Sequence, residues 1–451
     1  MDADSLRQML HSMLPATEIN ESARLLGVQL KRRKLDVPML VRALVMAGGS
    51  PRFGFQAAVM DTYFKLEAPE VSRSAFYQWF NEPLAALTAH LGQQACAYVR
   101  QQQVHLPGPL KGVTDWRAID SSTVKLPKEL KDVLPGTGDY AALKVHREYS
   151  IGTENVVDYH VSAAREHDAK HITIDEKRAG SGLLVDLGYA SHDTIRKCQK
   201  HNVQLVIRLK SAWNVWLDDA VPEEQMAGWL DDLDLQPQFT LEQATQRRSH
   251  EPLDVDVTLG PVSNILRMRL VSVYTDKGHC VFLTTLPRET HPPEIVGLLY
   301  RLRWCIEVDN KLSKSAFQLD NIDARTLPSA LTIVHSTMIA TIIANAFVHE
   351  THLKRGLRGQ HRRRISEPPL HPIRVAKFIA GAAASIATLM SDPNATDKAW
   401  AKWARLTVRQ GSDPNWRKRP SPIDVVKGRT PKLINLRRYA REPVAALRGL
   451  N

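Results

Sequence analysis

Apolar residues recur with helical spacing through the first 105 residues of the chain. The segments SLRQMLHSML, VPMLVRALVMA and SRSAFYQWFNEPLAALTAHLGQQACAYVR place an apolar residue every three to four positions, which is the period of an amphipathic helix. Ser72 and Ser74 are candidate N-caps. The run HLPGPLKG at 105–112 is rich in proline and glycine and predicts a linker. We therefore expect an all-helical N-terminal domain over residues 1–105.

Short apolar runs replace this pattern after the linker. Runs typical of strands lie at 115–120, 144–151, 155–164, 182–187 and 203–210, with helical patterns around 169–180 and 192–201. This alternation predicts an α/β domain over residues 106–350, built on a mixed five-stranded sheet with helices. Residues 211–290 alternate like antiparallel β structure in LDVDVTL, NILRMRLVSVYT and CVFLTTLP. We expect them to form a mostly β insertion.

One uncharged stretch, from Thr326 to Val348, is long enough to cross a membrane. It contains Pro328, His335 and Asn345, and no aromatic belts flank it. A buried core helix is the better interpretation, and we expect no membrane association. The four cysteines form no CxxC pair, and the first ten residues carry acids and no apolar signal region. Both features are typical of a cytoplasmic protein.

Charge is distributed unevenly along the chain. The whole sequence has 60 Lys+Arg and 48 Asp+Glu, a net charge of +12. Residues 351–451 hold 22 Lys+Arg and 6 Asp+Glu, a net +16, which leaves −4 for the first 350 residues. The clusters are Arg362-Arg363-Arg364, WRKRP at 416–420 and NLRRYAR at 435–441. A single-sign field of this size favours contact with nucleic-acid phosphates, the alternative being a role in solubility. We expect a basic, helical C-terminal region over residues 351–451.

The run LLYRLRWCIEVDNKLSKSAF has no glycine or proline and predicts one continuous helix. At roughly 100° per residue, Arg303, Glu307 and Lys314 lie about 300°, 340° and 320° around from Tyr300. These four residues would share an arc of about 60°, with Asp309 about 180° away and tolerant of replacement. A carboxylate among two cations and an aromatic favours a DNA-facing, metal-binding surface. The alternative is an exposed amphipathic helix.

The spacing Tyr-(2)-Arg-(3)-Glu-(6)-Lys resembles the signature of the insertion-sequence DDE transposases of the IS-four type. In that family the glutamate is the third member of an Asp-Asp-Glu triad on a ribonuclease-H-like fold. Asp120 in DWRAIDSSTVKLP and Asp186 in SGLLVDLGYAS each follow an apolar strand-like run, in the expected order. The resemblance implies an α/β ribonuclease-H-like catalytic domain whose catalytic and metal-binding residues are Asp120, Asp186 and Glu307.

Three carboxylates of this kind suit two divalent ions roughly 3.5–4 Å apart, which neutralise the attacking and leaving oxygens of phosphodiester chemistry. Asp120 would bridge both ions, while Asp186 and Glu307 would each complete one site. Mg²⁺ suits an all-carboxylate site, and Mn²⁺ should substitute.

The resemblance also implies that Tyr300, Arg303 and Lys314 bind DNA phosphates. Arg208 and Lys210, at the end of a predicted strand, are further DNA-binding candidates. His146, His167 and Asp168 resemble positions near the family's site, although ordinary strand and loop histidines explain them equally well. A zinc site at His160, His167 and His171 is disfavoured because no cysteine partners accompany them.

These features favour a DNA transposase that binds the terminal inverted repeats of its own element, cleaves the strands and transfers them to target DNA. Synapsis of two ends implies a homodimer, and the helical domain over residues 1–105, ahead of the catalytic domain, would bind the DNA of the element's ends, again by resemblance. Two alternatives are a transposase-derived DNA-binding protein without turnover and a stand-alone metal-dependent nuclease. A β insertion at 211–290 resembles transposases that cut through a DNA hairpin, and Trp213, Trp216 and Trp229 are candidates to stack on a flipped base. However, 13 acidic and 6 basic residues in this range disfavour that role.

Overall fold

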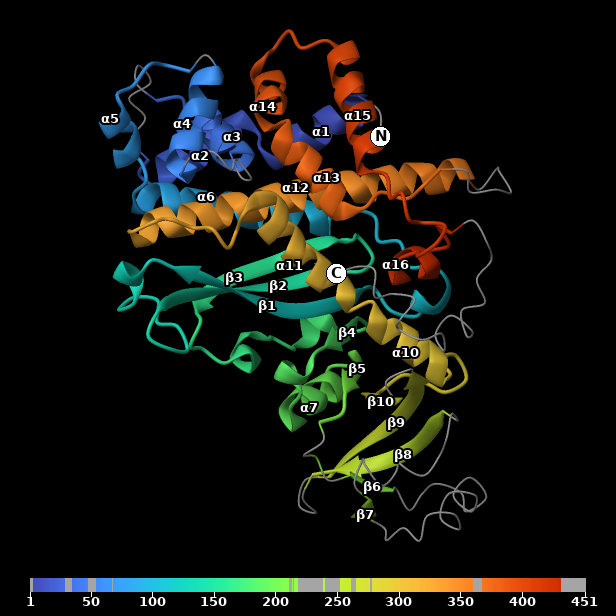
Figure 1. Ribbon diagram of the computed structural model, residues 1–451. Coiled ribbons are helices and arrows are strands. Elements are labelled where there is room, and N and C mark those ends of the chain that lie inside the picture. Colours follow the sequence, from blue (N-terminus) through green and yellow to red (C-terminus); the bar gives the residue numbers. More distant parts are fainter. Residues whose placement is uncertain are drawn as a thin grey trace. The chain divides into compact units, whose positions relative to one another are not determined.

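The computed structural model of this 451-residue chain describes residues 3–28, 35–47, 54–66, 68–210, 213, 215–217, 238–239, 252–260, 265–275, 278–359 and 367–430. The chain divides into two compact units (Figure 1). Unit 1 contains the described residues up to His105, Ser121–Glu166 and Ile306–Pro414. Unit 2 contains Leu106–Asp120, His167–Cys305 and the described residues from Asn415 onward. This division differs from the three consecutive domains predicted above, because N-terminal and C-terminal helices pack together in unit 1.

Helices dominate unit 1. Its N-terminal helices are α1 (Ala3–Met13), α2 (Ala16–Leu25), α3 (Val37–Met46), α4 (Phe55–Lys65), α5 (Arg73–Gln78) and α6 (Glu82–Arg100). Its later helices are α11 (Trp304–Phe317), which begins at the edge of unit 2, α12 (Leu327–Gly359), α13 (Pro372–Gly381), α14 (Ala383–Ser391) and α15 (Asp397–Gly411). Of the two candidate N-caps, Ser72 caps α5 by accepting from the amide of Ala75. Asn81 caps α6 in the same way.

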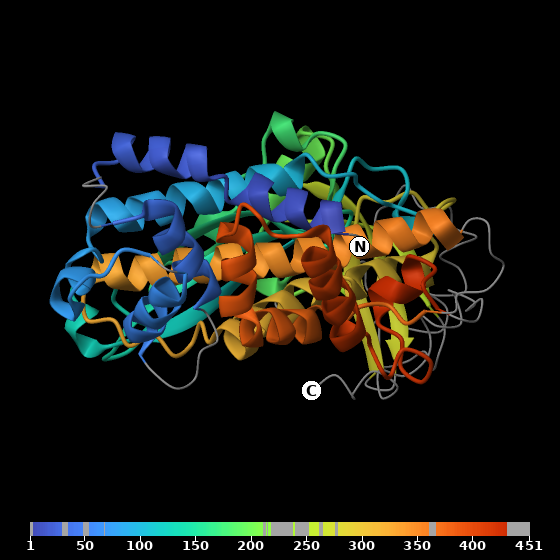
Figure 2. The same ribbon diagram turned by 90° about the horizontal axis from the view of Figure 1, so that it is seen from above.

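The long helix α12 forms the centre of unit 1. It runs beside α6 and also contacts α1, α3 and α13 (Figure 2). By length and composition α12 passes for a membrane span, but 89% of its most apolar window is buried inside the fold. The burial agrees with the core helix predicted for Thr326 to Val348, because neighbouring helices cover its apolar side chains.

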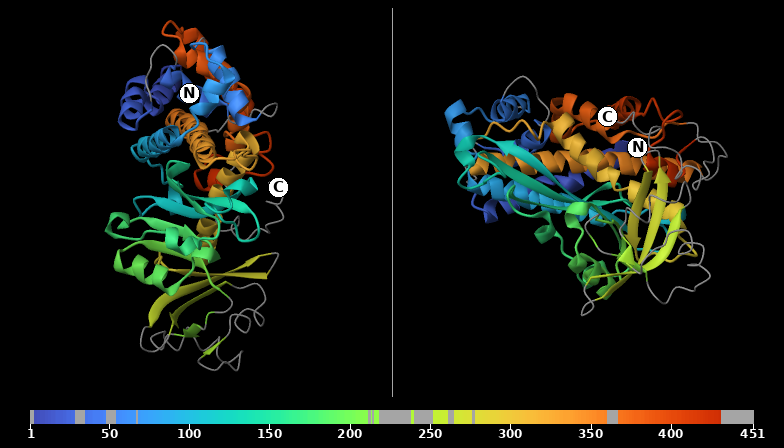
Figure 3. Two further views of the ribbon diagram at one scale, coloured as in Figure 1. Left: turned by 90° about the vertical axis from the view of Figure 1, so that its left-hand side faces the viewer. Right: turned by 60° about the horizontal axis from the view of Figure 1, so that its bottom comes forward.

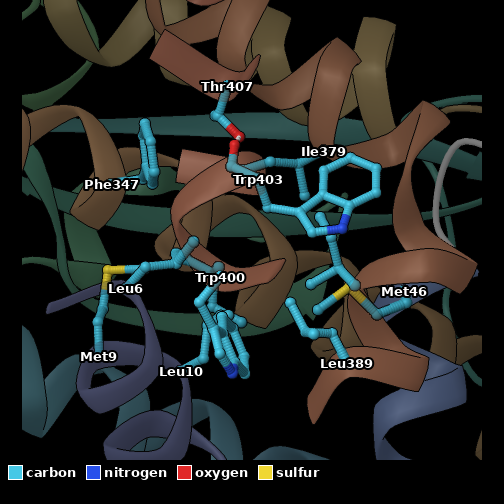
Figure 4. Close-up of a pocket in the computed structure, with 12 residues that line it drawn as sticks. Leu6, Met9, Leu10, Met46, Phe347, Ile379, Leu389, Trp400, Trp403 and Thr407 are labelled. Atoms are coloured by element: carbon cyan, nitrogen blue, oxygen red, sulfur yellow. Dashed lines mark hydrogen bonds between the residues drawn. The ribbon is translucent and has the colours of Figure 1, made fainter. Parts of the chain in front are cut away.

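A small apolar cavity lies among these helices, with a volume of about 20 Å³ (Figure 4). Leu6, Met9 and Leu10 of α1 line it together with Trp400 and Trp403 of α15. The first and last helices of unit 1 therefore share one core.

Two antiparallel strands complete unit 1, β2 (Ala141–Ser150) and β3 (Asn155–Ala163). They pair with Val145 opposite Val161 and shift register between Glu148 and Tyr149. Helices α6 and α12 pack on β3 (Figure 3). The side-chain amide of Gln93 on α6 donates to the carbonyl of Tyr159 at 2.8 Å, so a polar contact accompanies the apolar packing.

Unit 2 is built on a mixed sheet. Its strands are β1 (Trp116–Leu126), which continues into unit 1 from Ser121, β4 (Gly182–Val185), β5 (Gln204–Arg208), β6 (Val215–Leu217), β7 (Gln238–Phe239), β8 (Leu253–Leu259), β9 (Leu266–Thr275) and β10 (Gly278–Thr284). Their order is β1-β4-β5-β10-β9-β8-β6-β7. Strands β1, β4 and β5 are parallel, and the pairs from β5–β10 outward are antiparallel.

This sheet is larger than the five strands predicted. The strands expected in the β insertion are antiparallel, but they do not form a separate sheet, because β10 pairs with β5 and extends the parallel strands (Figure 3). The helix predicted around 169–180 is also absent from these described residues. Two short 3₁₀ turns, Asp168–His171 and Glu176–Arg178, occupy that stretch, and the predicted helix near 192–201 is α7 (His192–Lys200).

The two faces of this sheet are covered differently. Ile119, Val185 and Ile207 belong to a buried cluster that includes Ile195 and Cys198 of α7. Alternate residues of each strand point to the other face, where α10 (Pro293–Arg301) contacts β5, β9 and β10. The candidate side chains of unit 2 described next lie on the α10 face.

Candidate active site

Asp120 and Asp186 occupy equivalent positions on neighbouring parallel strands of unit 2. Ile119 pairs with Val185, so Asp120 and Asp186 are the next residues along β1 and β4. Adjacent strands lie about 4.8 Å apart, which brings the two aspartates side by side. Both are half-buried. The prediction that β1 ends at Asp120 is wrong, since β1 continues to Leu126. What ends near Asp120 is its pairing with β4, in which the last pair is Ile119 with Val185.

Asp120 and Asp186 form a row across the sheet, and Arg208 extends this row by one strand. Val185 pairs with Ile207, so Arg208 is level with Asp186 and exposed at the end of β5. Phe282 of β10 lies opposite Arg208. One line across β1, β4, β5 and β10 therefore holds two carboxylates, a guanidinium and an aromatic ring. It lies at the carboxyl ends of the parallel strands, where open α/β sheets usually carry their ligand-binding and active sites.

Tyr300 connects α10 to this row. Its hydroxyl donates to Oδ1 of Asp186 at 3.4 Å, and its ring centroid lies 4.9 Å from that of Phe282. Burial raises the pKa of Tyr300 well above its usual value, so the hydroxyl stays a neutral donor through the physiological range. Tyr300 thus supports Asp186 from the helix side of the sheet.

Two cations lie against aromatic rings in this part of unit 2. The Arg303 guanidinium lies 5.7 Å from the Tyr300 ring centroid, within the range of a cation–π contact. Lys210 follows β5, and its ammonium lies 5.8 Å from the ring of Trp213. These positions suit the DNA-binding role predicted for Arg208, Lys210 and Arg303, a role that stays a prediction.

The tryptophans proposed for base stacking differ in their surroundings. Trp213 packs against the buried cluster of unit 2 and against the ring of His192, 4.9 Å away. Trp216 of β6 is 37% exposed. Trp229 lies outside the described residues. Trp216 is therefore the better placed of the two described candidates to meet a base.

The predicted continuous helix across the Tyr-Arg-Glu-Lys motif is wrong. Helix α10 ends at Arg301, and α11 begins at Trp304. The amide of Leu302 donates to the carbonyl of Leu299, and that of Arg303 donates to Tyr300. These tight i to i+3 bonds end α10 around the fully buried Leu302. Tyr300 and Glu307 therefore lie on different helices, and the single helical face proposed for the four residues does not exist.

Glu307 and Lys314 lie on α11 in unit 1, whereas the aspartates lie in unit 2. Glu307 is half-buried in the first turn of α11, where the helix dipole favours a carboxylate. The Lys314 ammonium donates to the carbonyl of Thr123 at 3.0 Å. Lys314 therefore ties α11 to the second half of β1 within unit 1.

Asp309 is a residue whose importance the sequence did not indicate. It is 2% exposed, and its Oδ2 accepts from Nη1 of Arg147 at 2.7 Å. Its Oδ1 accepts from the side-chain amide of Asn345 at 2.6 Å. Arg147 also donates to the hydroxyl of Ser313 at 2.7 Å. The expectation that Asp309 tolerates replacement is wrong, because its carboxylate balances a buried guanidinium.

The histidines singled out above have structural surroundings. His146 is buried, with Nε2 2.9 Å from the hydroxyl of Ser162, and its ring stacks on that of His160 at 4.6 Å. His167 accepts from the amide of Ala169 through Nδ1 and begins the turn that contains Asp168. Capping accounts for the position of His167, whereas ring nitrogens of His146, His160 and His171 lie within 4.8 Å of one another, a spacing that could hold a metal ion.

The basic C-terminal clusters are only partly described. Arg417, Lys418 and Arg419 are exposed in unit 2, and the Arg417 guanidinium lies 5.1 Å from the ring of the buried Trp416. The clusters at 362–364 and 435–441 lie outside the described residues. Exposure leaves the described cluster open to a polyanion.

Residues 112–343 match the family model described as transposase DDE domain. The match covers half of the chain and includes both aspartates and Glu307. The chain belongs to the transposase DDE domain family. The resemblance stated from the motif residues is thereby confirmed at the level of the family.

Three relatives illustrate this membership. The chain is 25% identical over 286 residues to the transposase for insertion sequence element IS231C of Bacillus thuringiensis subsp. berliner, covering 56% of this chain and 59% of the relative. It is 20% identical over 264 residues to the transposase for IS1151 of Clostridium perfringens, covering 51% and 56%. It is 24% identical over 235 residues to the putative transposase InsL for IS186A of Escherichia coli K12, covering 48% and 63%. The matches span about half to three-fifths of the lengths of these relatives.

Among solved structures, the chain is similar to the piggyBac transposase synaptic complex with hairpin DNA. The TM-score is 0.46 at 11% sequence identity, with 91% of this chain and 85% of that chain covered. A likeness at this level does not decide the fold, so the strand order and the site described above stand on their own geometry.

The donor set of the DDE family member fits a hard divalent cation. Asp120 and Asp186 present carboxylates from adjacent strands, and oxygen ligands of this kind are preferred by Mg²⁺ and Mn²⁺. Both are only half-buried, which leaves room for the metal-bound waters that Mg²⁺ retains.

Proposed function

We propose that this protein is a DNA transposase that binds the ends of its own insertion sequence in the bacterial cytoplasm, cleaves the DNA strands and joins them to a target. The observation that carries the proposal is the shared register of Asp120 and Asp186 on β1 and β4, in a chain that belongs to the DDE family. Glu307 is the third carboxylate of the proposed triad.

We further propose that the catalytic domain has the ribonuclease-H-like fold. Three features support this: the order β3-β2-β1 with an antiparallel β2–β3 pair, the order β1-β4-β5 with parallel pairs, and an aspartate on both β1 and β4. The antiparallel strands β6–β10 would then be an insertion that extends the sheet beyond β5.

In the proposed mechanism, Asp120, Asp186 and Glu307 would hold two Mg²⁺ ions, for which Mn²⁺ could substitute. When bound, such ions activate the attacking oxygen and neutralise the leaving oxygen. Tyr300 orients Asp186 through its hydroxyl. Arg208, Lys210 and Arg303 bind phosphates of the transferred strand from the α10 face, and Lys314 adds a further phosphate contact from α11.

Separate substitutions test the triad. Asp120→Asn, Asp186→Asn and Glu307→Gln should each abolish cleavage of end-containing DNA in Mg²⁺, while gel shifts show end binding unchanged. Mutation of the exposed Asp193 to Asn is the matched control, because Asp193 pairs only with Lys197 in the described contacts and should leave cleavage intact. Full cleavage by any triad variant would refute the assignment.

The same assays separate the alternatives. Cleavage products joined to a second DNA molecule would indicate a transposase, cleavage without joining would indicate a nuclease, and binding without cleavage would indicate a DNA-binding protein. A homodimer is expected in the synaptic complex. Light scattering of the protein with two end fragments, compared with one, should show two protein copies per pair of ends.

A further inference from the structure

Four exposed cations follow one face of α15 in unit 1. Lys398, Lys402, Arg405 and Arg409 are spaced at i, i+4, i+7 and i+11, so at about 100° per residue they lie within an arc of about 60°. All four side chains are exposed. We call these four residues the α15 stripe.

The opposite face of α15 is buried. Trp400, Ala404, Thr407 and Gly411 point into unit 1, and the ring of Trp403 packs on Phe378 of α13 at 5.8 Å. The helix therefore has no spare apolar face for a lipid bilayer, which an interfacial membrane helix requires. Packing fixes α15 against the bundle and presents the stripe to solvent.

One more cation adjoins the stripe at its C-terminal end. Arg374 of α13 is exposed, and its Nε donates to the carbonyl of Gln410 at 3.1 Å. Arg374 thus adds one exposed cation at the C-terminal end of α15.

No acidic residue of α15 shares the face of the stripe. The helix has a single acid, Asp397 in its first turn, which forms an ion pair with Arg7 of α1. Exposed helix faces usually mix both signs of charge and gain from i to i+4 pairs, whereas like charges at this spacing weaken a helix. An anionic partner laid along the stripe would remove that repulsion.

We propose that the α15 stripe binds the phosphate backbone of duplex DNA, independently of base sequence. This inference rests on the proposed function, because it assigns to α15 a DNA contact outside the catalytic row. The eleven residue steps from Lys398 to Arg409 rise about 16 Å, a length that matches roughly five phosphates of one strand along the duplex axis. Lysine and arginine contacts to phosphate position a protein on DNA without reading bases.

The test compares two full-length variants that lose equal charge. One changes Lys398, Lys402, Arg405 and Arg409 to Gln. The matched control changes Lys65, Lys177, Lys197 and Lys200, all exposed and on elements other than α13 and α15, to Gln. Binding to a duplex of unrelated sequence is measured by fluorescence anisotropy from 50 to 300 mM salt. Circular dichroism and the melting temperature check the fold, and the double variant Lys402→Gln/Arg405→Gln replaces the quadruple one if that fails to fold.

The stripe variant should bind at least tenfold more weakly near 0.1 M salt, and its log–log salt slope should fall by about 2 to 4, at roughly 0.9 per lost contact. The control should keep the wild-type slope. The inference would be overturned if the stripe variant kept the wild-type salt slope, or if both variants lost DNA affinity equally. It would also be overturned if the stripe variant lost binding only to phosphatidylserine vesicles, tested in parallel, and not to DNA.

These readouts do not depend on catalysis. A protein that binds duplex DNA through the stripe but never cleaves would contradict the proposed function alone. A protein that cleaves and joins DNA while the stripe variant keeps the wild-type slope would contradict only the role of α15.

Discussion

Arg147 and Asp309 stand 162 residues apart in the sequence and form an ion pair of 2.7 Å between Nη1 and Oδ2, with side chains 0% and 1% exposed. The pair joins β2 to α11, the helix that carries Glu307, and Asn345 adds a bond from α12. We therefore regard Arg147 and Asp309 as positioning residues for Glu307.

Asp309→Asn and Glu307→Gln each replace a carboxylate with an amide, two positions apart in the sequence. We expect the first to lower stability and the second to abolish cleavage without lowering stability. Asp309→Asn leaves a buried guanidinium without its counter-charge, so the free energy of unfolding should fall by about 3 kcal/mol and the melting temperature by several degrees. Glu307→Gln should keep the melting temperature and abolish cleavage. Differential scanning fluorimetry and a cleavage assay measure both, and equal melting temperatures for the two variants would contradict the positioning role.

Tyr300→Phe should preserve the fold and slow cleavage. The ring can still pack on Phe282, but the hydroxyl that donates to Asp186 is lost. A hydrogen bond is worth about 0.5–1.5 kcal/mol, so we expect roughly a two- to tenfold lower rate. The Mg²⁺ dependence of single-turnover cleavage measures this effect. Tyr300→Ala, which also removes the packing, is the comparison and should be less stable; equal rates for Tyr300→Phe and wild type would show that Asp186 needs no such support.

Gly92→Ala should destabilise unit 1. A Cβ at this position of α6 would overlap the hydroxyl of Tyr159 and approach its Cζ to 2.9 Å. Since Tyr159 is buried on β3, the helix and the strand would have to separate, at a cost of about 1–3 kcal/mol. The matched control is Gly356→Ala in α12, where a Cβ meets nothing within 4 Å; it should stabilise by up to about 1 kcal/mol. Urea unfolding of both variants should give shifts of opposite sign.

The stability of unit 1 should fall as the pH is lowered from 6.5 towards 4. Burial lowers the pKa of His335 to about 4, and its Nδ1 lies 3.0 Å from the hydroxyl of Tyr159. In this window the unfolded chain binds a proton that the folded protein excludes, so protonation favours unfolding by up to about 3 kcal/mol. His335→Gln keeps an acceptor but cannot titrate. Its melting temperature should therefore depend less steeply on pH than that of wild type, and parallel curves would contradict this assignment.

The neighbouring strand positions of Asp120 and Asp186 could be predicted because their signals are local. A short apolar run followed by Asp120, and another followed by Asp186, are visible in any window of ten residues. The break between Tyr300 and Glu307 could not be predicted, since no glycine or proline marks it and burial of Leu302 decides it. The role of Asp309 depends on Arg147, which no local pattern connects to it. Helical periodicity predicts the helices of unit 1 but not which of them pack together, because contacts such as those between α1 and α15 join distant parts of the chain.

The contact between α1 and α15 delays part of folding until the end of protein synthesis. The Arg7–Asp397 pair spans 390 residues, and the apolar side chains of α1 meet Trp400 and Trp403 in one core (Figure 4). At about 5–20 residues per second, a ribosome takes roughly 20 to 80 s to synthesise the chain between these helices. During this time Leu6, Met9 and Leu10 lack their partners on α15, so chaperones or a provisional contact with α6 must cover these apolar side chains. Completion of the helical bundle is therefore tied to the end of translation rather than to its beginning.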